Sequence, residues 1–174
     1  AMINFKRCCL ILLWSFTLAG CSIQSSQLNA VMGLFDQAEV PFDTNSWVVE
    51  FGDYNALVYP LAVDNGTLFS NQFGDVILFD GWTVREVSGL GHRLRLGIAD
   101  DGDARRYMYG NRFVAQHQCD AWQSEQQSGM IRFSEFCWGQ SQYTNMIQVG
   151  DKGQISLIMQ NIDGSNQYLT LRKK

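Results

Sequence analysis

The chain has 174 residues, of which 46% are hydrophobic and 13% aromatic, with 13 basic and 17 acidic side chains. Without Lys6 and Arg7, residues 21–174 keep 11 basic and 17 acidic side chains, a formal charge of −6, and show no basic stripe. This balance excludes nucleic acid as an expected partner. The 154 residues of this part suffice for one domain with a real core, and their glycine-rich, proline-poor composition favours many strands joined by tight turns.

Residues 1–20 have the organisation of a secretory signal peptide. Lys6 and Arg7 precede an apolar run over residues 8–18, which is followed by the small residues Ala19 and Gly20. The run is too short to span a bilayer comfortably, so we do not expect a permanent transmembrane helix. The cleavage site is expected after Gly20.

The sequence Leu18-Ala19-Gly20-Cys21 resembles the bacterial lipobox, in which the cysteine becomes lipidated and the signal is removed before it. The resemblance implies a lipid anchor on Cys21 with three acyl groups, and three chains hold effectively permanently because each buried methylene contributes about 0.8 kcal/mol. Ser22 follows, which by resemblance to lipoprotein sorting favours the periplasmic face of the bacterial outer membrane. The alternative is an ordinary signal peptide with a cysteine after Gly20.

The five cysteines agree with an oxidising compartment. Two of them leave with the signal and one carries the lipid, and the whole set is Cys8, Cys9, Cys21, Cys119 and Cys137. The remaining pair, Cys119 and Cys137, predicts a disulfide that closes a loop of about 18 residues and stabilises by roughly 3 kcal/mol. Two free buried thiols are the alternative. A metal centre is not expected, since His92 and His117 are the only histidines and no Cys-x-x-Cys spacing occurs.

Residues 21–45 are predicted to form a lipidated linker with a short helix. Polar residues follow the anchor, and apolar residues then recur at roughly helical spacing over residues 27–37. Gly33 inside this stretch weakens the helical pattern.

Residues 46–174 predict an all-β domain, an antiparallel meander of about ten strands curled into a barrel or half-barrel. Strand-like stretches run from Trp47–Phe51 to Gln167–Arg172, with no second helix to make a βαβ crossover. Asp80-Gly81 and Gly110-Asn111 each predict a two-residue hairpin turn. Residues 123–129 predict a polar loop.

No group of residues in the sequence forms a complete catalytic or metal-binding motif. His92 lies in a predicted turn, and His117 is expected on the same strand face as Phe113 and Ala115, as a histidine at the edge of the core. The acidic residues at 100, 101 and 103 match only part of a calcium loop and are explained by a solvated turn. No catalytic residue, cofactor or metal ligand is therefore predicted.

The aromatic residues carry two interpretations. On a sheet they can stack sugar rings or line an apolar pocket, or they can serve as ordinary core packing. The set within or beside predicted strands is Trp47, Trp82, Trp122, Trp138, Tyr107, Tyr109, Tyr143 and Tyr168.

Two stretches resemble one known family. Residues 74–91 show an apolar strand, Asp80-Gly81, a strand with a basic residue, and Gly-Leu; residues 143–160 contain a late hairpin with an Asn, a glycine turn and a strand ending near Gln160. With the lipobox, these stretches are similar to the YjbF/GfcB family of outer-membrane lipoproteins, encoded with exopolysaccharide and group 4 capsule secretion genes. The resemblance implies a β-meander lipoprotein that assists polysaccharide export, with no catalytic residues to carry over.

Three functions follow as hypotheses. The first is a non-enzymatic lipoprotein that serves surface polysaccharide assembly or export, with polysaccharide or export proteins as partners. The second is a half-barrel carrier of lipid or lipoprotein, which requires a large apolar cavity. The third is a periplasmic glycan-active enzyme, which requires two carboxylates about 5–10 Å apart.

Overall fold

The computed structural model describes residues 45–91 and 94–174, and these residues form thirteen β-strands and no helix. The predicted signal peptide, Cys21, the predicted helix over 27–37 and His92 lie outside the described residues. The strands are β1 (Trp47–Phe51), β2 (Tyr54–Val63), β3 (Gly66–Ser70), β4 (Val76–Phe79), β5 (Val84–Gly89), β6 (Leu94–Asp101), β7 (Ala104–Tyr109), β8 (Arg112–Cys119), β9 (Gln123–Gln127), β10 (Met130–Trp138), β11 (Gln142–Val149), β12 (Ile155–Asn161) and β13 (Tyr168–Lys173).

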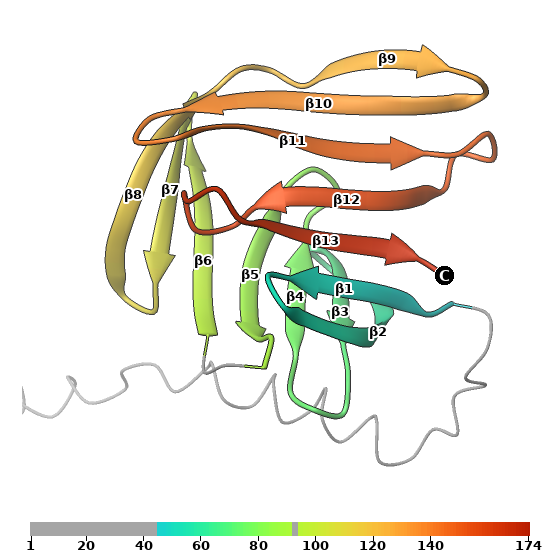
Figure 1. The fold of residues 1–174 in the computed structure, drawn as a ribbon, viewed down its shortest axis with the longest axis horizontal. Helices are drawn as coiled ribbons and strands as arrows, with labels where there is room; N and C mark the ends of the chain where they lie inside the picture. The colour runs from blue at the N-terminus through green and yellow to red at the C-terminus, as the bar shows by residue number, and fades with distance from the viewer. Residues whose placement is uncertain (1–44, 92–93) are drawn as a thin grey trace, which may run out of the picture. The chain divides into compact units, whose positions relative to one another are not determined.

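Twelve of these strands close into an antiparallel barrel. Each strand from β1 to β7 pairs with the next, β8 pairs with β10, the strands from β10 to β13 pair in order, and β13 pairs with β1. In Figure 1, strands β10–β13 and β1 run horizontally, whereas strands β5–β8 run roughly vertically. The strands of the two walls of the barrel therefore cross each other. The all-β meander predicted from the sequence is confirmed, and it closes as a barrel.

The interior follows from the alternation of side chains along each strand. In β6, for example, Leu96 and Ile98 point inward and are buried, whereas Arg95 points outward and is exposed. The fully buried apolar side chains come from both walls and include Val49, Val58, Ile77, Val84, Leu90, Ile147, Ile158, Leu169 and Leu171. Burial of this set is the main stabilising contribution to the fold.

The polar stretch near residue 125 is a strand, so the predicted loop over 123–129 is wrong. Strand β9 pairs with β10 from Gln127↔Met130 to Ser134↔Gln123, and Ser128-Gly129 forms the turn with positive φ at both residues. All five residues of β9 are exposed. A strand with both faces in water lacks the alternation of apolar and polar residues from which a strand is predicted.

Pro60 occupies a locally unpaired side of β2. Strand β1 pairs with β2 only as far as Trp47↔Val58, and beyond that point β2 pairs with β3 alone, with Pro60 opposite Phe69. The missing N–H of Pro60 therefore costs no hydrogen bond between strands. This agrees with the edge position that proline predicts in a strand.

Among the described residues, none belongs to a helix with the length and hydropathy that a membrane span requires.

Candidate binding pocket at one end of the barrel

A pocket of about 300 Å³ opens where several strand ends meet. In an antiparallel meander, the end of β4, the start of β5, the end of β6, the start of β7 and the end of β8 lie at the same end of the barrel. The pocket is lined by residues of the β4–β5 loop, the β6–β7 turn and the segment 119–122, together with Glu135 of β10. Topology thus gathers residues that are spread along the chain from Asp80 to Glu135.

The β4–β5 loop is wider than the predicted two-residue turn at Asp80-Gly81, which is therefore wrong. Phe79 pairs with Val84, so residues 80–83 all belong to the loop. The Asp80 carboxylate accepts hydrogen bonds from the backbone N–H groups of Trp82, at 2.8 Å, and Thr83, at 2.7 Å. This local bonding stabilises the wider turn and removes Trp82 from the strand.

The aromatic wall of the pocket is formed by Trp82 and Trp122. Their ring centroids lie 5.6 Å apart with the planes tilted by 42°, and Phe133 meets Trp82 edge-on at 5.2 Å. The Trp82 side chain is 47% exposed. Its loop is nevertheless held in place, because the Trp82 carbonyl accepts a hydrogen bond from the Gln160 side chain. An indole on a fixed loop thereby faces solvent at the pocket.

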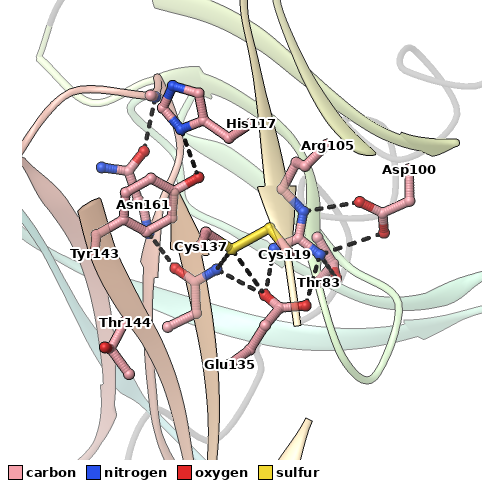
Figure 2. The surroundings of a disulfide bond; sticks show 12 residues. Thr83, Asp100, Arg105, His117, Cys119, Glu135, Cys137, Tyr143, Thr144 and Asn161 are labelled. Carbon is pink, nitrogen blue, oxygen red and sulfur yellow. Dashed lines mark hydrogen bonds and ion pairs between the residues drawn. A yellow bond between two sulfur atoms is a disulfide. The ribbon is translucent and has the colours of Figure 1, made fainter. Parts of the chain in front are cut away.

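Arg105 forms the polar floor of the pocket. Its guanidinium donates to both oxygens of Glu135, at 2.5 and 3.1 Å, and to Asp100 at 2.8 Å, and it also reaches the Thr83 hydroxyl at 3.2 Å. Figure 2 shows Arg105 between Asp100 and Glu135. Arg105 and Glu135 are both buried, and Asn145 donates a further hydrogen bond to Glu135 at 2.9 Å. The pair thus has the additional partners that a buried ion pair needs.

Arg85 extends this network to the pocket rim, where it pairs with Asp80 at 2.5 Å and Asp100 at 2.8 Å. Burial raises the pKa of Asp80, but the N–H groups of Thr83 and Trp82 and the Arg85 guanidinium outweigh it, so that pKa lies below its ordinary value. Burial likewise raises the pKa of Asp100, and the two arginines outweigh it. Burial lowers the pKa of Arg105, yet Asp100 and Glu135 together raise it.

Two carboxylates of the pocket have no such partner. Asp103 lies in the β6–β7 turn and Asp120 follows β8, both are exposed, and neither forms an ion pair within the described part of the chain. The lining as a whole has five carboxylates and two guanidinium groups. The pocket therefore carries a net negative formal charge of −3.

The disulfide predicted between Cys119 and Cys137 is present at the pocket wall (Figure 2). The two cysteines are direct neighbours in register, with Cα atoms 4.1 Å apart. The next pair along β10 is Ser134↔Gln123. Between the two pairs the chain advances three residues on β10 but four residues from Cys119 to Gln123, so the segment after Cys119 contains a one-residue bulge. Cys119, Glu135 and Cys137 also lie close enough for a metal site, but both sulfur atoms are held in the disulfide.

His117 lies in a separate buried cluster beside the pocket. Its Nδ1 is 3.1 Å from the Tyr143 hydroxyl, which is also hydrogen-bonded to Tyr107, whereas Nε2 has no partner among the described residues. Burial lowers the pKa of His117 and raises those of Tyr107 and Tyr143. A Cβ on Gly139 would come within 2.3 Å of the imidazole ring, so a glycine is needed there.

The predicted face of β8 is only partly right. His117 and Ala115 are buried together, but Phe113 is 55% exposed on the outer face. The register between β7 and β8 shifts between Tyr107 and Met108, which places Phe113 opposite Met108 and Ala115 opposite Tyr107. This bulge turns Phe113 outward, and hydrophobic periodicity alone does not show it.

The structure divides the predicted aromatic set. Only Trp82 and Trp122 reach the pocket. Trp47 packs in the core against Phe69, Tyr107 and Tyr143 are buried beside His117, and Trp138 stacks on Phe136 outside the barrel. The polar residues of the floor, Arg105 and Glu135, were not predicted, since they lie thirty residues apart without a motif.

No family model matches the chain, and comparison with curated proteins and with solved structures also gives no match.

Proposed function

We propose that this protein is a non-enzymatic outer-membrane lipoprotein, anchored through Cys21, that assists the assembly or export of surface polysaccharide. The observation that carries the proposal is the pocket with Trp82 and Trp122 on one wall and a hydrogen-bonding floor of carboxylates and guanidinium groups. Sites for small polar ligands combine aromatic surface with a few fixed polar groups in this way. The lipobox and the resemblance to capsule-secretion lipoproteins support the cellular setting.

The protonation states favour binding over hydrolysis. A glycoside hydrolase needs one carboxyl group with a raised pKa as general acid. The pKa values of Asp80 and Asp100 lie below the ordinary value, and Glu135 is held by Arg105 and Asn145. The Asp80 and Asp100 carboxylates are therefore suited to accepting hydrogen bonds rather than to donating a proton.

The pocket argues against the lipid-carrier alternative. An acyl chain requires an apolar cavity, whereas this pocket presents five carboxylates and two guanidinium groups. The apolar side chains that point inward from the strands pack against one another in the core instead.

Deletion of the gene tests the proposal. Surface polysaccharide, quantified on cells of the encoding bacterium, is expected to fall and to be restored by the wild-type gene but not by Cys21→Ser. Unchanged surface polysaccharide in the deletion strain would refute the proposed function.

A further inference from the structure

The charge distribution of the pocket can discriminate among sugars. Arg85 and Arg105 are each paired with two carboxylates, so both positive charges are already compensated within the protein. The carboxylates without a cationic partner, Asp103 and Asp120, are exposed at the pocket. An incoming group therefore meets negative charge that is not compensated by the protein.

The aromatic wall and the volume of the pocket indicate what kind of ligand fits. Trp82 offers an exposed indole, which packs against the tilted ring of Trp122 and meets Phe133 edge-on. A cavity of about 300 Å³ is at the small end of the range for ligand sites, so it suits a single ring rather than a folded oligomer. The indole face also attracts a cation that is placed over it.

We propose that this pocket binds one sugar residue of a polysaccharide, that the residue is neutral or carries an amine, and that uronic acids are rejected. The proposal rests on the proposed function and names the chemistry of its ligand. The sugar ring stacks on Trp82, and its hydroxyl groups donate to the exposed carboxylates. A protonated amine adds attraction to Asp103 and Asp120, whereas a uronate carboxylate meets repulsion from the same groups.

Calorimetric titration of the full-length lipidated protein in detergent tests this selectivity. The three probes are hexamers of glucosamine, of N-acetylglucosamine and of galacturonic acid. We expect the glucosamine hexamer to bind most tightly and the galacturonate hexamer to bind about tenfold more weakly than the neutral hexamer. Added salt is expected to weaken binding of the glucosamine hexamer and to leave the neutral hexamer unaffected.

Two sets of variants locate the binding. Trp82→Ala is expected to weaken all binding about tenfold, whereas Trp138→Ala, which removes an exposed tryptophan from the outer face, leaves it unchanged. Asp103→Asn with Asp120→Asn is expected to abolish the preference for amine over neutral sugar, while Asp64→Asn with Asp151→Asn, at exposed turns elsewhere, preserves it. Unchanged thermal unfolding of each variant shows that the fold is retained.

Three results would overturn the proposal: galacturonate binding as tight as that of the neutral hexamer, equal effects of Trp82→Ala and Trp138→Ala, or no binding of any probe. The last result combined with lost polysaccharide in the deletion strain refutes the pocket assignment alone. Binding as expected combined with normal polysaccharide in that strain refutes the proposed function alone.

Discussion

Leu90 is held in a left-handed backbone conformation, with φ of 56°, by the Asp75 carboxylate, which accepts its N–H at 2.6 Å. A leucine in this conformation costs about 1–2 kcal/mol. The side chain of Leu90 is fully buried, which offsets that cost by about 1.5–3 kcal/mol. The same carboxylate accepts hydrogen bonds from the Tyr54 hydroxyl, at 2.5 Å, and the Asn71 amide, at 2.7 Å. Asp75 thus ties three segments of the barrel together.

Asp75→Ala is expected to lower the free energy of unfolding by about 2–3 kcal/mol, because buried donors lose their acceptor. Burial and the hydrogen bond to Asp75 raise the pKa of Tyr54 to about 12, so this pKa should fall toward 10.0 in the variant. Urea unfolding measures the first effect and ultraviolet titration the second. Asp64→Ala, at an exposed turn, is the control and should change stability by less than about 0.5 kcal/mol. Equal stability of the two variants would contradict the role of Asp75.

The disulfide is expected to stabilise the seam between β8 and β10, which otherwise pair through only two residue pairs, Cys137↔Cys119 and Trp138↔Gln118. Replacing both cysteines by serine should lower stability by about 3 kcal/mol. Reductant should lower the stability of the wild type by a similar amount and leave the double variant unchanged. Mass mapping without reductant checks the bond directly, and free thiols on both Cys119 and Cys137 would show that the disulfide is absent.

Glu135→Ala is expected to lower the free energy of unfolding by about 3 kcal/mol or more, because the buried guanidinium of Arg105 then keeps only Asp100 as an ionic partner. The exposed pair Arg106–Asp101, on the same β6–β7 hairpin as Arg105, provides the matched control. Asp101→Ala should change stability by no more than about 1 kcal/mol. Chemical unfolding of the two variants makes the comparison, and a similar loss in both would show that burial does not matter here.

His117 predicts a specific dependence of stability on pH. Its folded-state pKa lies below the ordinary value of 6.5, so the folded state favours the neutral ring while the unfolded state takes up the proton first. The stability contribution is therefore complete above pH 6.5 and declines as the pH falls below it, with a slope of at most about 1.4 kcal/mol per pH unit. Asp80 and Asp100, whose pKa values are lowered from 3.8, add their own loss only at still lower pH.

Unfolding at pH 7.5 and 5.5 tests this expectation, with His117→Gln as the reference that cannot titrate. The stability difference between the wild type and this variant should shrink at the lower pH. A difference that stays constant would mean that the histidine does not titrate differently in the two states.

The lipid anchor makes a separate prediction. Cys21→Ser should abolish labelling by a palmitate analogue and leave the precursor uncleaved by the lipoprotein signal peptidase. Labelling that persists in the variant would refute the assignment of the anchor.

Local patterns in the sequence predict most of the strands, since alternation in segments such as β6 and the turn at Gly110-Asn111 depend on neighbouring residues alone. Two of the features that local patterns miss involve a change of register. One bulge sets Cys119 opposite Cys137, and another turns Phe113 outward. A bulge depends on what the strand packs against, so it leaves no periodic signal.

The pocket is predictable only in part, because most of its contacts join residues that are far apart in the sequence. A meander places the β4–β5 loop and the β6–β7 turn at one end, and this follows from strand order. The meeting of Trp82 with Trp122 does not, because it requires the Asp80 loop to widen and the segment after Cys119 to leave β10. Likewise, nothing near Arg105 in the chain indicates that its partner is Glu135.

The pairing of β1 with β13 has a consequence for how the chain reaches its folded state. Trp47 lies opposite Lys173, so the ring closes only through contacts between strands more than a hundred residues apart. Until β13 emerges during synthesis, β1 and β12 each present an open edge that another chain can join. The partly made protein is therefore most exposed to aggregation just before its last strand is added, and chains that stop short of β13 should accumulate in insoluble material.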